Sequence, residues 1–332
     1  MLPCLPGVEV LRQLTLRLLD EATPPEDLAR ICVELHGWFT DAAPLDSSPS
    51  EAGRLPTGLA LPPDLAAQCI LDSKRTVAFV RGLFLALAEA RRRFTHGEIE
   101  VVYAGTGPFA PLVLPLMTAQ PLPGVVFTFI DFHRRATDAV QELIARLGLG
   151  KRARRVTDGD ATSYNHPTPI HVVLTETLQR SLDTEPFVGI VRNLRRQLAP
   201  GGLVVPERVA VDVALIDAAS QQAQWSGTAP AEQHESLARL FEVTAQGEFP
   251  PLDKHGRSEA VVVIIPEGRP HLERWIALIT RVDVFGTIRL REHESGLTVP
   301  QILWPLSPAH GGDVLEFCYI LDKAPGLRWT RL

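Results

Sequence analysis

Cysteine is scarce in this chain, and the four that occur are widely separated. Cys4, Cys32, Cys69 and Cys318 contain no Cys-x-x-Cys pair, which argues against a zinc site and against a disulfide framework. Few and scattered cysteines without a disulfide pattern are typical of proteins in a reducing compartment. We therefore expect a cytoplasmic protein that binds no metal ion.

Long apolar runs and an excess of positive charge are also missing. No stretch reaches the roughly 18 apolar residues of a membrane-spanning helix, and the first residues lack the basic-then-apolar pattern of a secretory signal. The net charge of −6 argues against nucleic acid as the main partner. The basic run Lys151–Arg155 is typical of a solvated edge. The chain also lacks a Gly-x-Ser-x-Gly elbow and a P-loop, so the sequence indicates neither of the corresponding enzyme classes.

Residues 1–60 have the pattern of a helical extension followed by a linker. Apolar residues recur at three- and four-residue spacing over 8–45, with Pro24 and Pro25 between two amphipathic helices. Residues 41–62 are rich in proline, serine and small residues, which predicts a loop. A further helix is predicted over 62–93, with prolines at its start and arginines at its end.

From residue 98 onward, strand and helix patterns alternate. The apolar segments EIEVVYAG, GVVFTFID, ARRVTDGDA, IHVVLTE and LVVPERVAV are expected strands, and the last helix between them is expected to end at a glycine pair. This alternation predicts an α/β domain over 61–205, with a mostly parallel sheet covered by helices on both faces. Residues 206–332 contain short β-rich runs, which predict a barrel or sandwich. The polar stretch 215–245 is expected to form an arm.

Gly105, Thr106 and Gly107 directly follow the first expected strand. Glycines in a strand-to-helix turn let the backbone approach a ligand closely, and the N-terminus of the next helix favours negative charge. A tight turn without any ligand explains a single Gly-x-Gly equally well.

Acidic residues follow the next two strands. Asp131 ends the second strand, 26 residues after Gly105, where an acid commonly accepts hydrogen bonds from ribose hydroxyls. A helix N-cap is the alternative. Asp160, beside Ala161, follows the third strand and could meet an adenine amino group, or it could simply form a turn.

Two glutamates nine residues apart, Glu176 and Glu185, follow Thr175 at the end of the fourth strand. Both should lie at the carboxyl edge of the sheet, where ligands of such folds bind. Two converging carboxylates suit a guanidinium or an amine, because one can orient the nitrogen while the other draws away a proton. Alternatively, Glu185 only complements a helix N-terminus.

Three segments together, CILDSKRTVAF, TETLQRSLDTE and LAPGGLVVPERVAV, resemble the protein arginine methyltransferases, a family of class I S-adenosylmethionine-dependent methyltransferases. The resemblance covers roughly residues 62–332. It implies a Rossmann-like seven-stranded domain, then a β-barrel, with S-adenosylmethionine as methyl donor and a homodimer formed through the arm. The spacing of the glutamates corresponds to the family's double-E loop, so Glu176 and Glu185 would hold the acceptor. The implied donor-binding residues are Arg75 for the carboxylate, Gly105, Thr106 and Gly107 for the methionine part, Asp131 for the ribose, and Asp160, Ala161 and Thr175.

The chain departs from the family at three places. The aromatic YFxxY element expected before the Arg-Thr helix is missing. Val101 and Tyr103 stand where the family has an acid and a further glycine, and Thr298 and Val299 stand where a His-Trp pair would complete the arginine pocket. We therefore expect N-methylation of a guanidino or amino group on a small molecule, an amino acid or a peptide. Two alternatives remain: intramolecular or aminocarboxypropyl chemistry on the same donor, and a non-catalytic scaffold. The preference for arginine over lysine suits a divergent bacterial member.

Overall fold

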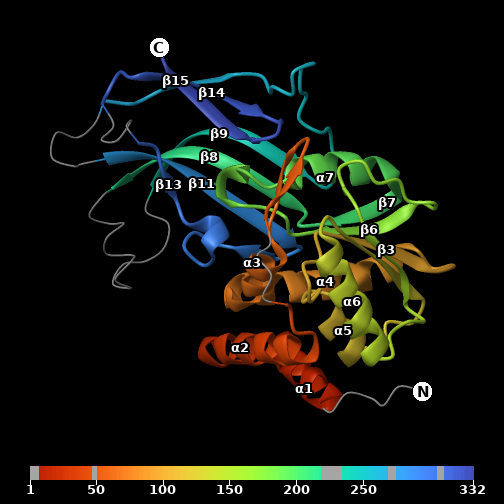
Figure 1. The fold of residues 1–332 in the computed structure, drawn as a ribbon. Coiled ribbons are helices and arrows are strands. Elements are labelled where there is room, and N and C mark those ends of the chain that lie inside the picture. Colours follow the sequence, from red (N-terminus) through yellow and green to blue (C-terminus); the bar gives the residue numbers. More distant parts are fainter. Residues whose placement is uncertain (1–6, 47–50, 218–233, 268–273, 305–309) are drawn as a thin grey trace.

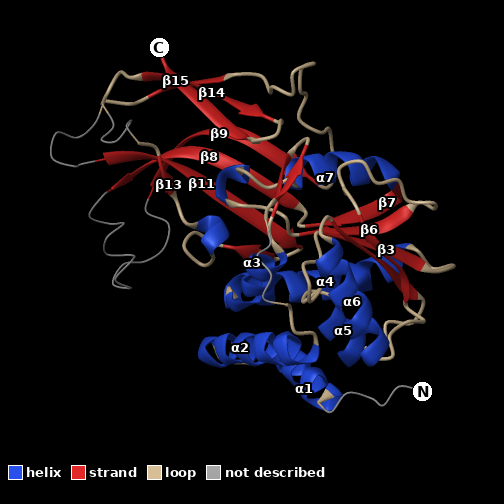
Figure 2. Ribbon diagram, viewed as in Figure 1, coloured by secondary structure: helices blue, strands red, loops and turns tan. Residues whose placement is uncertain are grey.

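The computed structural model describes residues 7–46, 51–217, 234–267, 274–304 and 310–332. Helices and strands form two regions, a parallel sheet with helices and a set of antiparallel strands (Figures 1 and 2). Among the described helices, none combines the length and the apolar character needed to cross a membrane.

The N-terminal extension consists of helices α1 (Val8–Leu19) and α2 (Pro25–Ala42). Their apolar faces are buried, and Phe39 of α2 stacks on Phe109 with ring centroids 5.5 Å apart. Arg81 donates hydrogen bonds of 2.8 Å to the carbonyl oxygens of Leu18 and Asp20 at the end of α1. The extension is therefore fixed to the rest of the molecule.

The expected helix over 62–93 is interrupted. It consists of α3 (Pro63–Gln68), the 3₁₀ turn η1 (Cys69–Leu71) and α4 (Ser73–Arg93). Asp72 explains the break, because its carboxylate accepts the backbone N–H of Arg75 at 3.2 Å and so caps a new helix. The expected loop 41–62 also contains a short hairpin, β1 (Gly53–Leu55) with β2 (Gly58–Ala60), that the composition did not indicate.

Within the described residues, the parallel sheet has five strands in the order β5-β4-β3-β6-β7, rather than seven. The strands after β7 pair antiparallel with one another and do not extend this sheet. The strand order reverses between β3 and β6, which marks a crevice at their carboxyl ends. The strands are β3 (Ile99–Ala104), β4 (Val125–Asp131), β5 (Ala153–Asp158), β6 (Ile170–Thr175) and β7 (Leu198–Val205).

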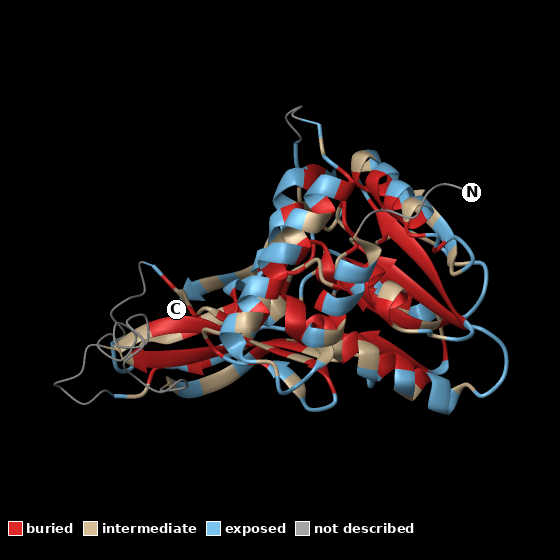
Figure 3. Ribbon diagram, turned by 90° about the horizontal axis from the view of Figure 1, so that it is seen from below, coloured by how far each residue is buried: buried red, intermediate tan, exposed pale blue. Residues whose placement is uncertain are grey.

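Helices cover both faces of this sheet. In Figure 1, α4, α5 (Leu114–Ala119) and α6 (Arg134–Arg146) lie below it, and α7 (Phe187–Leu194) lies above it. Its centre is buried (Figure 3): every residue of β3 and β4 is buried, whereas the edge strand β5 has no buried residue. The glycine pair Gly201–Gly202, expected to end a helix, belongs to β7 instead, because the 3₁₀ turn η3 (Arg195–Gln197) ends the helical segment earlier.

The antiparallel region contains two sheets, β12-β11-β8-β9 with β13 beside β11, and β10-β14-β15. They pack together through Phe241 and Tyr319, whose rings stack with centroids 4.1 Å apart. This arrangement agrees with the barrel-like second part that the sequence predicts. The elements are β8 (Arg208–Asp217), β9 (His234–Thr244), β10 (Val261–Ile264), β11 (Arg274–Phe285), β12 (Ile288–Leu290), η4 (Gly296–Thr298), β13 (Gln301–Ile302), β14 (Val314–Ile320) and β15 (Gly326–Arg331).

The expected arm at 215–245 is only partly described, because residues 218–233 lie outside the described ranges. Residues 234–244 form β9, which pairs with β8 along its length, so this part of the stretch belongs to the sheet. The boundaries expected at residues 60 and 205 remain predictions, although the parallel sheet does end at Val205.

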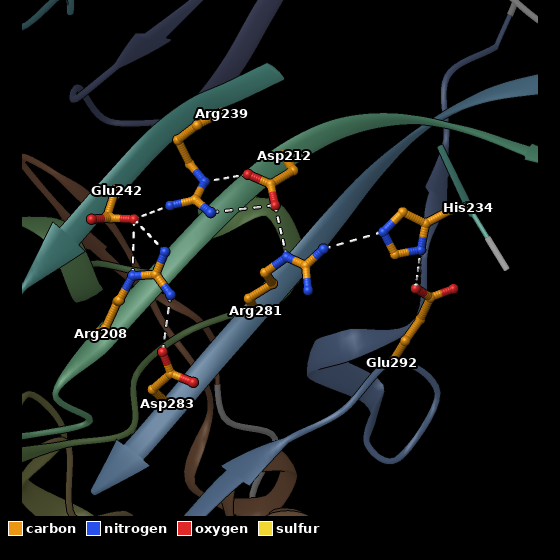
Figure 4. Close-up of polar contacts among 8 residues, drawn as sticks. All are labelled: Arg208, Asp212, His234, Arg239, Glu242, Arg281, Asp283 and Glu292. Atoms are coloured by element: carbon orange, nitrogen blue, oxygen red, sulfur yellow. Dashed lines mark hydrogen bonds and ion pairs between the residues drawn. The ribbon is translucent and has the colours of Figure 1, made fainter. Parts of the chain in front are cut away.

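One face of β8, β9 and β11 carries a chain of alternating charges (Figure 4). At its centre, Asp212 receives hydrogen bonds from Arg239 and from Arg281, the latter at 2.7 Å. The chain continues to Glu242 and Arg208 on one side and to His234 and Glu292 on the other. Burial opposes ionisation of Asp212, but the two arginines outweigh it and lower its pKa.

We expect Asp212→Asn to lower the free energy of unfolding by about 2 kcal/mol, less than the loss of a fully buried ion-pair partner. Arg239 and Arg281 are 36% and 37% exposed, so water partly solvates the charges left behind. Because the lowered pKa stabilises the fold only while Asp212 is ionised, the difference from the parent should vanish as the pH falls below about 4. Urea titrations at several pH values measure both effects.

Asp283→Asn is the matched control for this substitution. Among the described residues, Asp283 forms an ion pair with Arg208 alone, and its side chain is 31% exposed, so its loss should cost less than about 1 kcal/mol. Equal losses for the two variants would contradict a central role of Asp212 in the charged chain.

Candidate active site

A cavity opens at the carboxyl edge of the parallel sheet, where the strand order reverses. Its empty space, counted together with the open mouth, is about 850 Å³. Eight of the ten residues expected to form the site lie in its wall: Arg75, Gly105, Thr106, Gly107, Asp131, Ala161, Glu176 and Glu185. Asp160 and Thr175 are not among the described residues that line it.

The glycine turn after β3 needs residues without a side chain. Gly105 has φ of 75°, and a Cβ built on it would lie 2.0 Å from Cγ2 of Thr177. Thr177 is fixed in turn, because its hydroxyl lies 2.9 Å from that of the buried Thr175. The turn therefore brings bare backbone to the cavity wall, as expected from the Gly-x-Gly pattern.

Asp131 ties this turn to the end of β4. Its Oδ2 accepts the backbone N–H of Gly107 at 2.8 Å, and its Oδ1 accepts that of His133 at 2.9 Å. Burial raises the pKa of Asp131, and the two backbone donors oppose the shift. The carboxylate keeps free lone pairs toward the cavity, because each oxygen accepts only one of these bonds.

The turn after β5 contains Asp160 and Ala161, and only one of the two lines the cavity. Ala161 lines the cavity, while the Asp160 carboxylate accepts the backbone N–H of Thr162 at 2.7 Å. The structure thus favours the turn role that the sequence left open for Asp160.

Arg75 and Glu176 form a buried ion pair in the wall of the cavity. The side chains are 13% and 9% exposed, and the guanidinium also reaches the Glu176 carbonyl oxygen at 3.4 Å. Glu176 raises the pKa of Arg75, which stays charged. Burial raises the pKa of Glu176 to about 7, against the opposing effect of Arg75. Oε1 of Glu176 is buried and has no hydrogen-bond partner among the described residues, so it can accept a donor from a ligand.

Glu185 returns to the same cavity at the far end of the loop that begins with Glu176. It is 7% exposed, and burial and then the charge of Glu176 raise its pKa to about 8. The site therefore combines one permanent cation with two carboxyl groups that ionise near neutral pH. Such an arrangement can bind a cationic or hydrogen-bond-donating group and accept a proton from it.

The hairpin β1–β2 also belongs to the site, which the sequence pattern did not predict. Leu55 and Ala60 line the cavity. The N–H of Leu59 donates to the Thr184 carbonyl at 2.9 Å, and a Cβ on Gly58 would lie 2.8 Å from the nitrogen of Pro186. The only sequence signal is a Pro-Thr-Gly turn between the apolar positions Leu55 and Leu59.

The loop with Thr298 and Val299 approaches the site without lining it. Thr298 is fully buried in the turn η4, where its hydroxyl and Ser295 form a capping box. Asp72, which caps α4, accepts the Ser295 hydroxyl at 2.6 Å and the Gly296 N–H at 3.0 Å. The loop thus reaches the cavity indirectly, through the helix that carries Arg75.

No metal centre is evident: the described residues contain no group of three or more His, Cys, Asp or Glu side chains placed to hold an ion. Cys32, Cys69 and Cys318 are free thiols.

By sequence, no protein-family model and no curated protein matches this chain. Among solved structures, it is similar to the Trypanosoma brucei PRMT1 enzyme–prozyme heterotetrameric complex with AdoHcy, at 11% identity and a TM-score of 0.55, over 80% of this chain and 92% of that chain. It also matches Arabidopsis thaliana protein arginine methyltransferase 10 at 13% identity and a TM-score of 0.47, over 73% and 84% of the two chains. The first likeness confirms that this chain has the protein arginine methyltransferase fold.

Proposed function

We propose that this protein is an S-adenosylmethionine-dependent methyltransferase that methylates a guanidino or amino nitrogen of a small molecule, an amino acid or a peptide. The observation that carries the proposal is the convergence of Glu176 and Glu185 on the cavity that also contains Arg75, the glycine turn and Asp131. The fold is compatible with this donor, because the Trypanosoma brucei complex contains AdoHcy.

The residues of the cavity fit the donor. Gly105 and Gly107 bring backbone without side chains to its wall, Asp131 keeps acceptor capacity for ribose hydroxyls, and Arg75 is a permanent cation for a carboxylate. When bound, the donor supplies a methyl group already activated on a sulfonium. The protein then has mainly to position the acceptor and to balance its charge.

The two glutamates would act on the acceptor. Glu176, whose Oε1 lacks a partner among the described residues, would accept an N–H and so orient the nitrogen. Glu185 would take up a proton, since its pKa of about 8 makes it a stronger base than an exposed carboxylate. The apolar wall formed by Leu55 and Ala60, together with the absence of a His-Trp pair at Thr298–Val299, supports a small acceptor.

We also propose that the protein acts as a homodimer. A structurally similar protein also forms an assembly, since the Trypanosoma brucei enzyme–prozyme complex is a heterotetramer. The cytoplasmic location expected from the sequence remains a prediction.

Calorimetry with S-adenosylmethionine, followed by product analysis with arginine, agmatine and an arginine-containing peptide, tests the proposal. S-adenosylhomocysteine together with a methylated acceptor is the expected result. Methylthioadenosine would instead indicate aminocarboxypropyl chemistry, and failure to bind the donor would indicate a scaffold. Either outcome overturns the proposed reaction.

The rate should rise with pH over the range in which the two glutamates ionise. Because burial raises the pKa values of Glu176 and Glu185 to about 7 and about 8, acceptor turnover (kcat/KM) should increase between about pH 6 and 9. Stability should change in the opposite direction. The folded chain retains protons that the unfolded chain releases above pH 4.5, so the free energy of unfolding falls as the pH rises toward 8.

Rate profiles and urea titrations of the parent and of Glu185→Gln check both trends. The substitution removes one of the two ionising groups, so it should narrow the pH range of the rate increase and flatten the decline in stability. An unchanged stability profile in Glu185→Gln would show that Glu185 does not titrate in this range.

A further inference from the structure

The loop between the two glutamates has an unusual backbone. Ser181, Leu182 and Thr184 have φ values of 60°, 53° and 66°. These values lie in the left-handed region, which residues other than glycine rarely occupy. Ser181 and Leu182 are also buried. Left-handed residues in succession persist only where neighbouring structure holds them, and they concentrate at functional sites.

The antiparallel region supplies these holding contacts. The hydroxyl oxygen of Thr280, on β11, accepts the N–H of Ser181 at 2.7 Å. The hydroxyl of Tyr319, on β14, donates to the carbonyl oxygen of Leu182 at 3.0 Å. The carbonyl oxygen of Pro325, in the turn after β14, accepts the N–H of Thr184 at 3.1 Å.

Tyr319 is well placed to fix a backbone position. It is fully buried, and its ring stacks on Phe241. The hydroxyl group therefore has little freedom to move, and the Leu182 carbonyl that it binds lies three residues before Glu185. Close packing restricts the same stretch, since a Cβ on Gly326 would lie 2.6 Å from the Asp183 carboxylate.

We propose that Tyr319 and Thr280 are positioning residues for Glu185. Their hydroxyl groups hold the loop in its left-handed conformation, and this conformation returns the chain to the cavity so that Glu185 lies beside Glu176. The effect on turnover rests on the proposed function, but the effect on the loop itself does not.

Tyr319→Phe tests the first contact, because it keeps the stacked ring and removes only the hydroxyl. Hydrogen–deuterium exchange of the peptide spanning residues 178–186 should become about tenfold faster, since the Leu182 carbonyl loses its partner. The acceptor kcat/KM should fall about tenfold while the Kd of the donor stays unchanged. The pH of half-maximal rate should shift downward, because a displaced Glu185 becomes more solvated.

Matched variants separate positioning from general destabilisation. Tyr164→Phe removes a hydroxyl of the same kind, 3.2 Å from His166 and outside the loop, and should leave loop exchange and kinetics as in the parent. Thr280→Val should reproduce the effects of Tyr319→Phe. Thr280→Ser retains a hydroxyl acceptor and should therefore behave like the parent.

Loop exchange within twofold of the parent in both Tyr319→Phe and Thr280→Val would overturn the proposal. Equal losses of donor and acceptor binding would overturn it too, because they would indicate a structural role only. If the parent transfers no methyl group but its loop exchange responds as described, the proposed function fails while the positioning role stands.

Discussion

Replacing Glu176 with glutamine should lower the acceptor kcat/KM by about 100- to 10 000-fold, the usual range for losing a group that handles the reacting proton or its charge. Glutamine preserves the shape of the side chain and an oxygen that can still accept from Arg75. It removes the negative charge that offsets a cationic acceptor. The Kd of the donor should change by less than about threefold, because Arg75 retains a hydrogen-bond partner. Steady-state kinetics and calorimetry measure the two effects separately.

Glu100→Gln provides the matched control. Glu100 is also buried, at 7% exposure, and also pairs with an arginine, Arg154, but it lies near the opposite end of β3. This variant should lose stability without a selective loss of turnover. Full activity of Glu176→Gln, or loss of donor binding in it, would refute the role assigned to Glu176.

Replacing Gly105 with alanine should lower the free energy of unfolding by about 2–5 kcal/mol and weaken donor binding at least about tenfold. The left-handed backbone accounts for about 1–2 kcal/mol, and the contact with Thr177 accounts for about 1–3 kcal/mol more. Donor affinity should fall as well, because Gly105 and Thr177 both line the cavity. Urea titration and calorimetry of the purified variant measure the two losses.

Two further variants divide this effect into its causes. Gly148 has φ of 68° but no atom within 4 Å of the position of a Cβ, so Gly148→Ala should show the backbone cost alone. Thr177→Ser removes the methyl group that an alanine at position 105 would contact. A variant with both Gly105→Ala and Thr177→Ser should therefore recover most of the stability by which Gly105→Ala falls below Gly148→Ala. If Gly105→Ala and Gly148→Ala lose the same stability and donor affinity is intact, close packing at the turn is unimportant.

The convergence of the site residues could be predicted from the sequence, because parallel strands end at a common edge of the sheet. Gly105 and Glu176 each follow a strand of the sheet and Asp131 ends one, so the strand pattern alone places them at one edge. The pairing of Arg75 with Glu176 could not be predicted in this way. It joins residues 101 positions apart, and it depends on the break that Asp72 makes in the helix.

Other parts of the structure have no clear local pattern in the amino-acid sequence. The strand β9 has two register shifts against β8, which break its period of two, and Arg239 and Glu242 face the charged chain of Figure 4 rather than a core. The sequence therefore suggested a polar arm. The left-handed residues Ser181, Leu182 and Thr184 have no sequence signal either, since they are not glycines and tertiary contacts hold them.

The contacts of Asp72 have a consequence for the modularity of the molecule. One oxygen of its carboxylate caps the helix that carries Arg75, and the other binds Ser295 and Gly296 in the antiparallel region. Thr280 and Tyr319, from the same region, contact the loop that carries Glu185. The parallel-sheet region therefore provides the wall of the site, whereas the antiparallel region determines its alignment. We therefore expect that exchanging either region alone would disturb the site.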